Sequence, residues 1–148
     1  MAASGNVTCE WVDIGDGLRA YYGKPAGEGP FPAVVIYIEA FGVNDHFEKL
    51  TARFAEAGFV AITPDIYDSK IYAYDDLDNA IGHLKRMDDD TVIAQTAATV
   101  DFLEKRSEVK SGDICVTGFC MGGRYTFLAN AALASRFKAA ASFYGGAI

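Results

Sequence analysis

Apolar residues follow two patterns along this chain, and the two patterns alternate. Continuous apolar runs rich in β-branched residues are typical of strands covered on both faces. Apolar residues three and four positions apart are typical of helices that pack through one face. The predicted strands cover residues 32–38, 59–66, 113–118 and 138–146. The predicted helices begin at Asn44 or Asp45, at about Asp90, and at or just after Cys120.

The helical spacing also predicts which residues of each helix face the core. Gly58 ends the first helix, and the second helix ends near Arg106. The predicted inward residues are Phe47, Leu50, Phe54 and Ala57 in the first helix, Ile93, Ala97, Val100 and Leu103 in the second, and Tyr125, Leu128, Ala132 and Leu133 in the third.

Two further segments depart from this alternation. Residues 7–25 alternate roughly between apolar and polar around a Gly-Asp-Gly turn at 15–17, which predicts a β-hairpin. Residues 66–89 are rich in Tyr and Asp and are predicted to be irregular, with a weak helical spacing over 77–84. This segment is either a solvated excursion or a cover over the strand ends, where open α/β sheets bind ligands.

Strands that alternate with helices predict an α/β fold with a mostly parallel sheet, helices on both faces and an N-terminal hairpin. The 148 residues are 51% hydrophobic, with ten Phe and eight Tyr, so the chain can bury a sizeable core and is not disordered. We therefore expect residues 1–148 to form a single domain.

The formal net charge of -7 argues against nucleic acids and anionic membranes as partners. No apolar run is long enough to span a membrane, and the first residues do not resemble a signal peptide. The sparse cysteines, Cys9, Cys115 and Cys120, favour a reducing, cytoplasmic location. Cys115 is predicted to be core, and Cys9 has no supporting feature. Their spacing and surroundings do not fit a zinc site, so we expect no metal and no cofactor.

A cysteine lies between glycines at residues 118–122, in the sequence Gly-Phe-Cys-Met-Gly. With a strand before it and a helix after it, this is the context of a nucleophile elbow, a sharp turn that exposes the nucleophile. The helix N-terminus would favour a Cys120 thiolate. The Met121 N–H would stabilise an oxyanion. A buried structural cysteine in a tight turn is the alternative interpretation.

A glutamate follows the apolar strand at 32–37, inside the motif IEAFGVN at 38–44. A charge at this place is costly to bury without partners. Because parallel strands end at the same edge of a sheet, we expect Glu39 and Cys120 to face each other. The Ala40 N–H is the predicted second oxyanion donor, since folds with a nucleophile elbow take one from a loop of this kind. A solvent-facing glutamate that opens a loop is an equally good interpretation.

Three motifs together give the chain a resemblance to a known family. IEAFGVN at 38–44, AGFVAITPDIY at 57–67 and GFCMGG at 118–123 occur in the order and at the distances that resemble the dienelactone hydrolase family of α/β-hydrolases. The resemblance covers the whole chain. It implies hydrolysis of a small-molecule ester or lactone through an acyl-enzyme on cysteine.

By matching position, the resemblance implies a role for each of four residues. Cys120 is the nucleophile, and Glu39 contacts the thiol and helps to activate it. The N–H groups of Ala40 and Met121 form the oxyanion hole. The family also holds a substrate carboxylate with an arginine after the fourth strand, but residues 67–84 contain no arginine, so the substrate-binding residues stay unassigned. The nearest cations are Lys70, Lys85 and Arg86.

The catalytic base is not evident in the sequence. Triads of this fold follow the chain order nucleophile, acid, histidine, but His46 and His83 both precede Cys120. His46 is predicted to be a surface residue near the helix cap, and His83 a surface or lid residue. The last predicted strand would leave an open sheet edge. We therefore expect the N-terminal part of a longer hydrolase, with the acid and the histidine after Ile148, or a fold that a second chain or copy completes.

Two other classes of function fit the same residues. A non-catalytic α/β binding module would use Glu39, Cys120 and the tyrosines to hold a small ligand without turnover. A redox-sensing protein would use a low-pKa thiolate at Cys120. Cys115 is a poor resolving thiol for such a sensor because it lies on the preceding strand.

Overall fold

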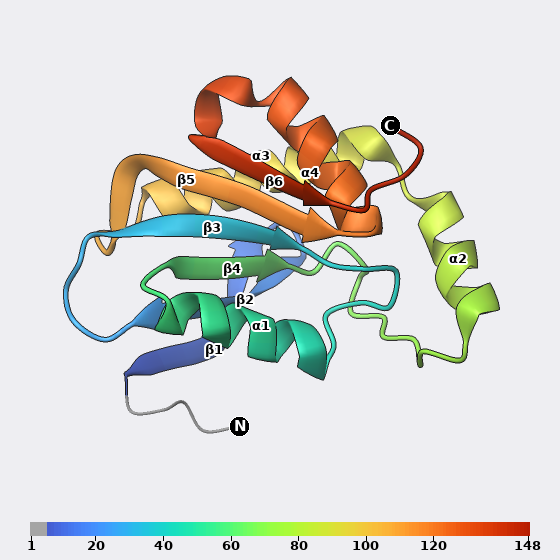
Figure 1. The fold of residues 1–148 in the computed structure, drawn as a ribbon, viewed down its shortest axis with the longest axis horizontal. Coiled ribbons are helices and arrows are strands. Elements are labelled where there is room, and N and C mark those ends of the chain that lie inside the picture. Colours follow the sequence, from blue (N-terminus) through green and yellow to red (C-terminus); the bar gives the residue numbers. More distant parts are fainter. Residues whose placement is uncertain (1–5) are drawn as a thin grey trace.

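One mixed β-sheet with helices packed on it forms the body of the protein (Figure 1). The structure is a computed structural model that describes residues 6–148. The prediction that the first residues are not a signal peptide concerns residues that lie partly outside this range. The described part of the chain has six strands: β1 (Val7–Gly15), β2 (Leu18–Pro25), β3 (Phe31–Tyr37), β4 (Val60–Pro64), β5 (Val109–Phe119) and β6 (Ala139–Phe143). They lie in the order β1-β2-β4-β3-β5-β6.

The sheet is antiparallel at one edge and parallel elsewhere. β1 and β2 form a hairpin, and β2 pairs antiparallel with β4. β4, β3, β5 and β6 are parallel to one another. This confirms the predicted α/β fold with an N-terminal hairpin. β6 forms the outer edge beyond β5, and all five of its residues are exposed.

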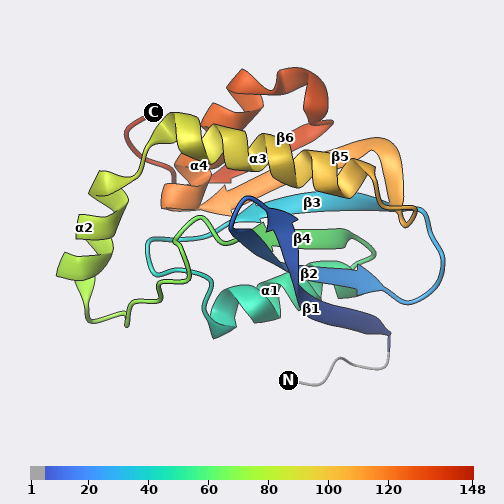
Figure 2. The same cartoon turned by 180° about the vertical axis from the view of Figure 1, so that it is seen from behind.

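Helices cover both faces of this sheet, as predicted. α1 lies in front of the sheet in Figure 1, and α3 lies in front of it in the reverse view of Figure 2. α4 packs on β5 and β6 beside α3. The helices are α1 (Asp45–Glu56), α2 (Leu77–Arg86), α3 (Asp89–Glu104) and α4 (Met121–Ala132), followed by a 3-10 turn at Ala134–Arg136. Asn44 caps α1 through its side chain, which accepts a hydrogen bond from the Phe47 N–H.

The inward faces of the helices differ in part from the predicted ones. Phe47, Val100, Leu103 and Tyr125 are buried as predicted. Ala57 and Ala132 are exposed, and Leu50, Phe54, Ile93, Ala97, Leu128 and Leu133 are half-buried. The buried positions include four threonines instead: Thr51, Thr96, Thr99 and Thr126. Each of these hydroxyls donates to the carbonyl four residues earlier, and this bond lets a polar residue occupy a core position.

Residues 66–89 are more regular than predicted, because they contain α2. Ala80 is the buried residue of this helix, whereas Leu77 and Ile81 are exposed. Leu84 of this helix is partly buried and packs against the core. Figures 1 and 2 show α2 projecting beyond the ends of the parallel strands.

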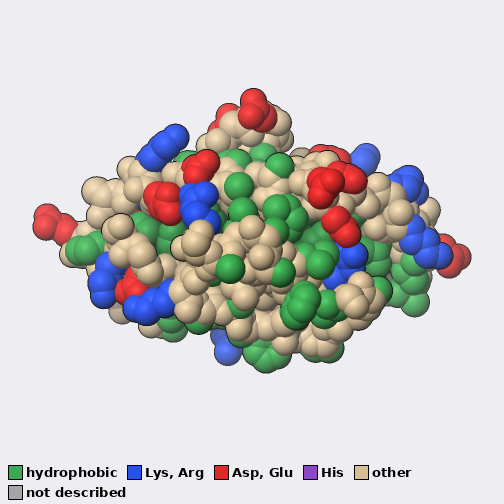
Figure 3. Space-filling view, turned by 90° about the horizontal axis from the view of Figure 1, so that it is seen from above, with side chains coloured by type: hydrophobic (Ala, Val, Ile, Leu, Met, Phe, Trp, Pro, Cys, Tyr) green, Lys and Arg blue, Asp and Glu red, His purple; other side chains and the backbone are tan. Residues whose placement is uncertain are grey.

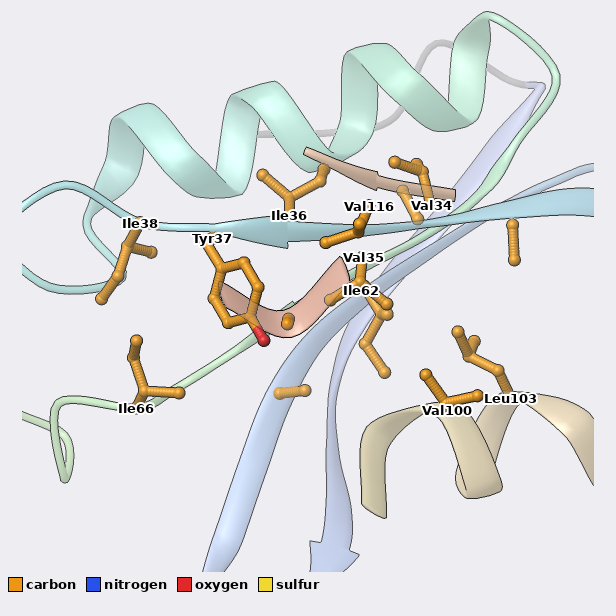
Figure 4. Packing of buried hydrophobic residues seen from close by; sticks show 14 of the residues in the cluster. Val34, Val35, Ile36, Tyr37, Ile38, Ile62, Ile66, Val100, Leu103 and Val116 are labelled. Carbon is orange, nitrogen blue, oxygen red and sulfur yellow. The ribbon is translucent and has the colours of Figure 1, made fainter. Parts of the chain in front are cut away.

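The hydrophobic core is centred on β3. Residues 33–38 are all buried, and Figure 4 shows Val34 and Ile36 on one side of the sheet and Val35 and Tyr37 on the other. On one side they approach Val100 and Leu103 of α3. This continuous burial explains the uninterrupted apolar run that identifies the strand.

Across residues 6–148, every helix is too short or too polar to cross a bilayer. On the face drawn in Figure 3, acidic and basic side chains lie next to one another and between apolar patches. The net charge of -7 is therefore not gathered into a single acidic patch on that face.

Candidate active site

The register of the two central strands brings the two predicted motifs together. β3 and β5 pair in parallel, with Tyr37 opposite Gly118. Glu39 and Cys120 each lie two residues beyond this pair, so both leave the sheet at the same place. In Figure 1 the arrowheads of the parallel strands point to this edge, which is where ligands bind in open α/β sheets.

Cys120 occupies a strained turn between β5 and α4. Its backbone has φ 57 and ψ -120, in a region that residues other than glycine rarely adopt. α4 begins at the next residue, Met121, and the Cys120 side chain is exposed. The structure therefore has the strand, sharp turn and helix that the sequence predicts. Cys115, predicted to be core, is half-buried because β5 lies next to the exposed edge strand.

The glycines around Cys120 allow a close approach of backbone to backbone. A Cβ on Gly118 would lie 2.2 Å from the Gly122 carbonyl oxygen. A Cβ on Gly122 would lie 2.5 Å from the carbonyl oxygen of Tyr37. Both distances are too short for any side chain, so glycine is required for α4 to start against the end of β3.

A backbone hydrogen bond fixes the turn at Cys120, and the N–H of the next residue, Met121, has no acceptor within its helix. The Cys120 N–H donates to the Phe143 carbonyl at 3.0 Å, so this donor is occupied and ties the turn to β6. The Met121 N–H is at the first position of α4, where a helix offers no internal acceptor. Ala40 follows Glu39 in the loop after β3, and both Ala40 and Met121 are buried.

Glu39 has a hydrogen-bond partner that the sequence does not reveal. The carboxylate is half-buried, and its Oε1 accepts a hydrogen bond of 2.8 Å from the Tyr144 hydroxyl. This bond raises the pKa of Tyr144 to about 12, with smaller contributions from burial and from the charges of Glu39 and Cys120. Tyr144 thus joins the ends of β3 and β6 next to Cys120. It lies 105 positions from Glu39, and no local motif marks it.

Tyr67, which ends the predicted motif at 57–67, is a second aromatic residue near Cys120. It is fully buried, and among the described residues its hydroxyl is the buried side-chain atom without a hydrogen-bond partner. Burial raises its pKa, and the neighbouring Tyr72, Tyr125 and Cys120 add to the effect through their charges. The Tyr67 ring stacks on the ring of His83 with centroids 3.9 Å apart.

Neither histidine lines the pocket that contains Cys120. His46 is exposed in the first turn of α1, as predicted. His83, predicted to be a surface or lid residue, lies half-buried in α2, where it stacks on Tyr67 and its Nδ1 lies 3.0 Å from the Tyr72 hydroxyl. Burial lowers the pKa of His83, and the charge of Arg86 lowers it further.

A pocket of about 830 Å³ opens beside Cys120, between the end of α2 and the starts of α3 and α4. Its lining residues are Leu84, Met87, Asp88, Asp89, Asp90, Cys120, Met121, Arg124, Tyr125, Gly146 and Ala147. A second pocket, of about 450 Å³, adjoins it and shares Met87 and Asp88. His83 and the cations Lys70 and Arg86 line this second pocket. Within residues 6–148 no cluster of three His, Cys, Asp or Glu side chains is arranged to hold a metal ion.

Arg124 organises one wall of the larger pocket. Its Nη1 and Nη2 atoms donate to the two carboxylate oxygens of Asp89 at 2.7 and 2.8 Å. Its Nε donates to the Ala147 carbonyl at 3.0 Å. The hydrogen bonds from Arg124 lower the pKa of Asp89, and this carboxylate in turn raises the pKa of Arg124. These bonds hold the starts of α3 and α4 and the C-terminal segment together.

Comparison with known proteins relates the chain to one protein family. The profile of the "Dienelactone hydrolase family" matches residues 18–148. The "Probable 2-oxo-3-(5-oxofuran-2-ylidene)propanoate lactonase" of Bradyrhizobium sp is 32% identical over 97% of this chain and 58% of its own length. The "Putative carboxymethylenebutenolidase" of Synechocystis sp. is 31% identical over 88% of this chain and 55% of its own length.

A solved structure shows the same arrangement of elements. The "Putative Dienelactone Hydrolase from Klebsiella pneumoniae" superposes with a TM-score of 0.85 at 26% identity. The match covers 96% of this chain and 61% of that one. The present chain thus spans about half the length of the curated relatives it matches.

Proposed function

Because this chain belongs to the dienelactone hydrolase family, we propose that it carries the nucleophile of an enzyme that hydrolyses an ester or a lactone. Cys120 is the nucleophile of this proposal. The observation that carries it is the placement of Cys120, which is exposed at a strained strand-to-helix turn. Cys120 and Glu39 each lie two residues beyond the paired Gly118 and Tyr37.

In the first step, the Cys120 thiol gives up its proton and its sulfur attacks the carbonyl carbon of the substrate. Glu39 is suited to receive that proton, because Oε1 holds Tyr144 and Oε2 stays available. The sulfur attacks from the N-terminal end of α4, where the helix begins at Met121. The N–H groups of Ala40 and Met121 stabilise the negative charge that develops on the carbonyl oxygen.

In the second step, the tetrahedral intermediate collapses. The carbon–oxygen bond of the ester breaks, the alkoxide leaves and takes up a proton, and a thioester on Cys120 remains. In a lactone the released alcohol stays attached to the acyl group. Water then cleaves the thioester to a carboxylic acid and the free thiol. Neither His46 nor His83 lines the Cys120 pocket. We therefore assign only the formation of the acyl-enzyme to the four site residues, Cys120, Glu39, Ala40 and Met121.

Replacing the nucleophile tests this proposal. We expect Cys120→Ala to lower the hydrolysis of a neutral aryl ester at least about a hundredfold, because the covalent step is lost. Cys115→Ala is the matched control, since Cys115 is half-buried in β5 and does not line the pocket. Ester turnover at the wild-type rate in Cys120→Ala would refute the assignment.

A further inference from the structure

The loop that follows β3 is held by a second loop, the one that follows β4. Residues 39–44 form the first loop, which carries Glu39 and the Ala40 N–H, and we call it the oxyanion loop. Residues 70–74 of the second loop lie against it, and we call them the support segment. Figures 1 and 2 show both loops leaving the sheet at the carboxyl ends of the parallel strands. Three separate contacts join them.

The first two contacts are between backbones. Gly42 has φ 89, in the left-handed region that glycine adopts without strain, and a Cβ here would collide with the Lys70 carbonyl oxygen. The two segments therefore touch with no room for a side chain between them. Two residues later, the Tyr72 N–H donates to the Phe41 carbonyl at 3.0 Å. Because Phe41 directly follows Ala40, this bond fixes the loop next to the proposed oxyanion donor.

The third contact comes from the side chain of Tyr74. Its ring meets the Phe41 ring edge to face, with centroids 4.9 Å apart. Its hydroxyl accepts a hydrogen bond of 3.2 Å from the Asn44 side-chain amide. Asn44 also caps α1, so Tyr74 contacts the oxyanion loop near its start and again where the helix begins. Tyr74 is nevertheless 60% exposed, so its side chain contributes little to the core.

The support segment is itself fixed at the end of β4. The turn before it, at residues 68–69, has φ values of 50 and 65, which residues other than glycine adopt only at a cost. The Lys70 N–H closes this turn by donating to the Tyr67 carbonyl at 2.9 Å. Further along, the Tyr72 hydroxyl lies 3.0 Å from Nδ1 of His83 in α2. A segment held in this way can impose its position on the loop that it touches.

We propose that the support segment positions the oxyanion loop, and that Tyr74 is a positioning residue for formation of the acyl-enzyme. This inference rests on the proposed function, in which the Ala40 N–H stabilises the charge that develops on the substrate carbonyl oxygen. Such a donor must lie within hydrogen-bond distance of that oxygen, and a displacement of about 1 Å lowers the rate strongly. Tyr74 does not line the Cys120 pocket, so it acts through Phe41 and Asn44.

Two reactions of the same sulfur separate this role from a general effect on Cys120. With p-nitrophenyl acetate, the thiolate attacks the carbonyl carbon, an oxyanion forms, p-nitrophenolate leaves and a thioester remains. With iodoacetamide, the thiolate displaces iodide and no oxyanion forms. Acylation would be followed as p-nitrophenolate release above the level of Cys120→Ala, and alkylation by peptide mass spectrometry. The ratio of the two rates measures oxyanion stabilisation, because accessibility and ionisation of the thiol affect both reactions.

The ratio of acylation to alkylation should depend on the side chain at position 74. In Tyr74→Ala we expect it to fall about tenfold, because the oxyanion loop loses both side-chain contacts. Tyr74→Phe keeps the ring contact and should lose only about twofold to threefold, for the missing hydrogen bond. Phe127→Ala is the matched control, since Phe127 is an exposed aromatic residue that lines neither pocket. This control should leave the ratio unchanged.

Two results would overturn the inference. One is a ratio in Tyr74→Ala that equals the wild-type ratio, which includes the case in which both rates fall in equal proportion and the role of Tyr74 is only structural. The other is an equal fall of the ratio in Phe127→Ala. Failure of the proposed function is a separate outcome, because it would appear as p-nitrophenolate release that survives in Cys120→Ala.

Discussion

At the scale of single residues, Tyr144 controls how Glu39 is held beside Cys120. Its hydroxyl donates to the carboxylate, and its ring packs at 6.2 Å from the ring of Phe119. Its backbone has φ 40, a conformation that costs about 1–2 kcal/mol for a residue with a side chain. A strained tyrosine that reaches a candidate catalytic carboxylate indicates that the orientation of Glu39 matters to the site.

Removing the charge of Glu39 should lower the pKa of Tyr144. In Glu39→Gln we expect this pKa to fall from about 12 toward 10, because the phenol loses its bond to a carboxylate and the phenolate loses a repulsive neighbour. The measurement is a pH titration of the Tyr144 ring carbon by NMR. Tyr125 is the internal control: its pKa is raised to about 12 by burial and by Asp89, and it should not move. An unchanged Tyr144 titration would contradict the assigned hydrogen bond.

The residues of the site differ in how far the sequence reveals them. Cys120 and Glu39 can be predicted because each interrupts a local pattern, one inside a glycine motif and the other after an apolar strand. Tyr144 and the Arg124–Asp89 pair cannot be predicted from the sequence, because their roles depend on contacts between residues 35 or more positions apart. A residue of this kind has no local spacing that distinguishes it from an ordinary surface residue.

At the scale of elements, the junction of β5 and α4 determines where the site can form. α4 starts against the end of β3, because Gly118 and Gly122 let backbone meet backbone. Ser142 of β6 strengthens the junction, since its hydroxyl donates to the Gly123 carbonyl at 2.7 Å. The site therefore depends on a close helix–sheet contact that involves three strands.

A single methyl group at this junction should destabilise the fold. Gly122→Ala places a Cβ 2.5 Å from the Tyr37 carbonyl oxygen, and backbone on both sides cannot move away easily. We expect the free energy of unfolding to fall by about 3 kcal/mol, measured by urea denaturation. In the control, Gly146→Ala, the added Cβ meets no atom within 4 Å, and the change should stay within about 0.5 kcal/mol. Equal stabilities of the two variants would contradict the packing argument.

Elements were easier to predict than the faces they bury. The strands and three of the helices follow from apolar runs and apolar spacing. The inward faces of those helices cannot be predicted in the same way. Threonines such as Thr51 and Thr96 donate their hydroxyl to a carbonyl of their own helix, so they can pack in the core as apolar residues do.

At the scale of the whole molecule, the two ends of β5 serve different purposes. Its carboxyl end leads to Cys120. Its amino end follows a cluster of Tyr22, Arg106 and Glu108, in which the Arg106 guanidinium also lies over the ring of Phe102 in α3. Glu108 accepts hydrogen bonds of 2.7 Å from the Tyr22 hydroxyl and 3.0 Å from Arg106 Nε. Burial opposes ionisation of Glu108, but these hydrogen bonds prevail and lower its pKa to about 2.

The low pKa of Glu108 predicts how stability depends on pH. The folded carboxylate binds a proton more weakly than the unfolded one, whose pKa is near 4.5. Its stabilising contribution is therefore complete above pH 4.5 and is lost as the pH falls toward 2. Denaturant unfolding of Glu108→Gln across this range should show a smaller loss of stability than the wild type. Glu10→Gln, at an exposed position in β1, should follow the wild type; identical slopes for all three proteins would contradict the prediction.

The position of β3 has a consequence for synthesis on the ribosome. β3 lies between β4 and β5, and its partner on one side is made more than 70 residues later. Until Val109–Phe119 leaves the exit tunnel, the nascent chain carries an unpaired strand edge along the apolar residues 33–37. Such an edge can pair with another nascent chain. Pauses in translation between α2 and β5 should therefore prolong the interval in which this protein depends on chaperones.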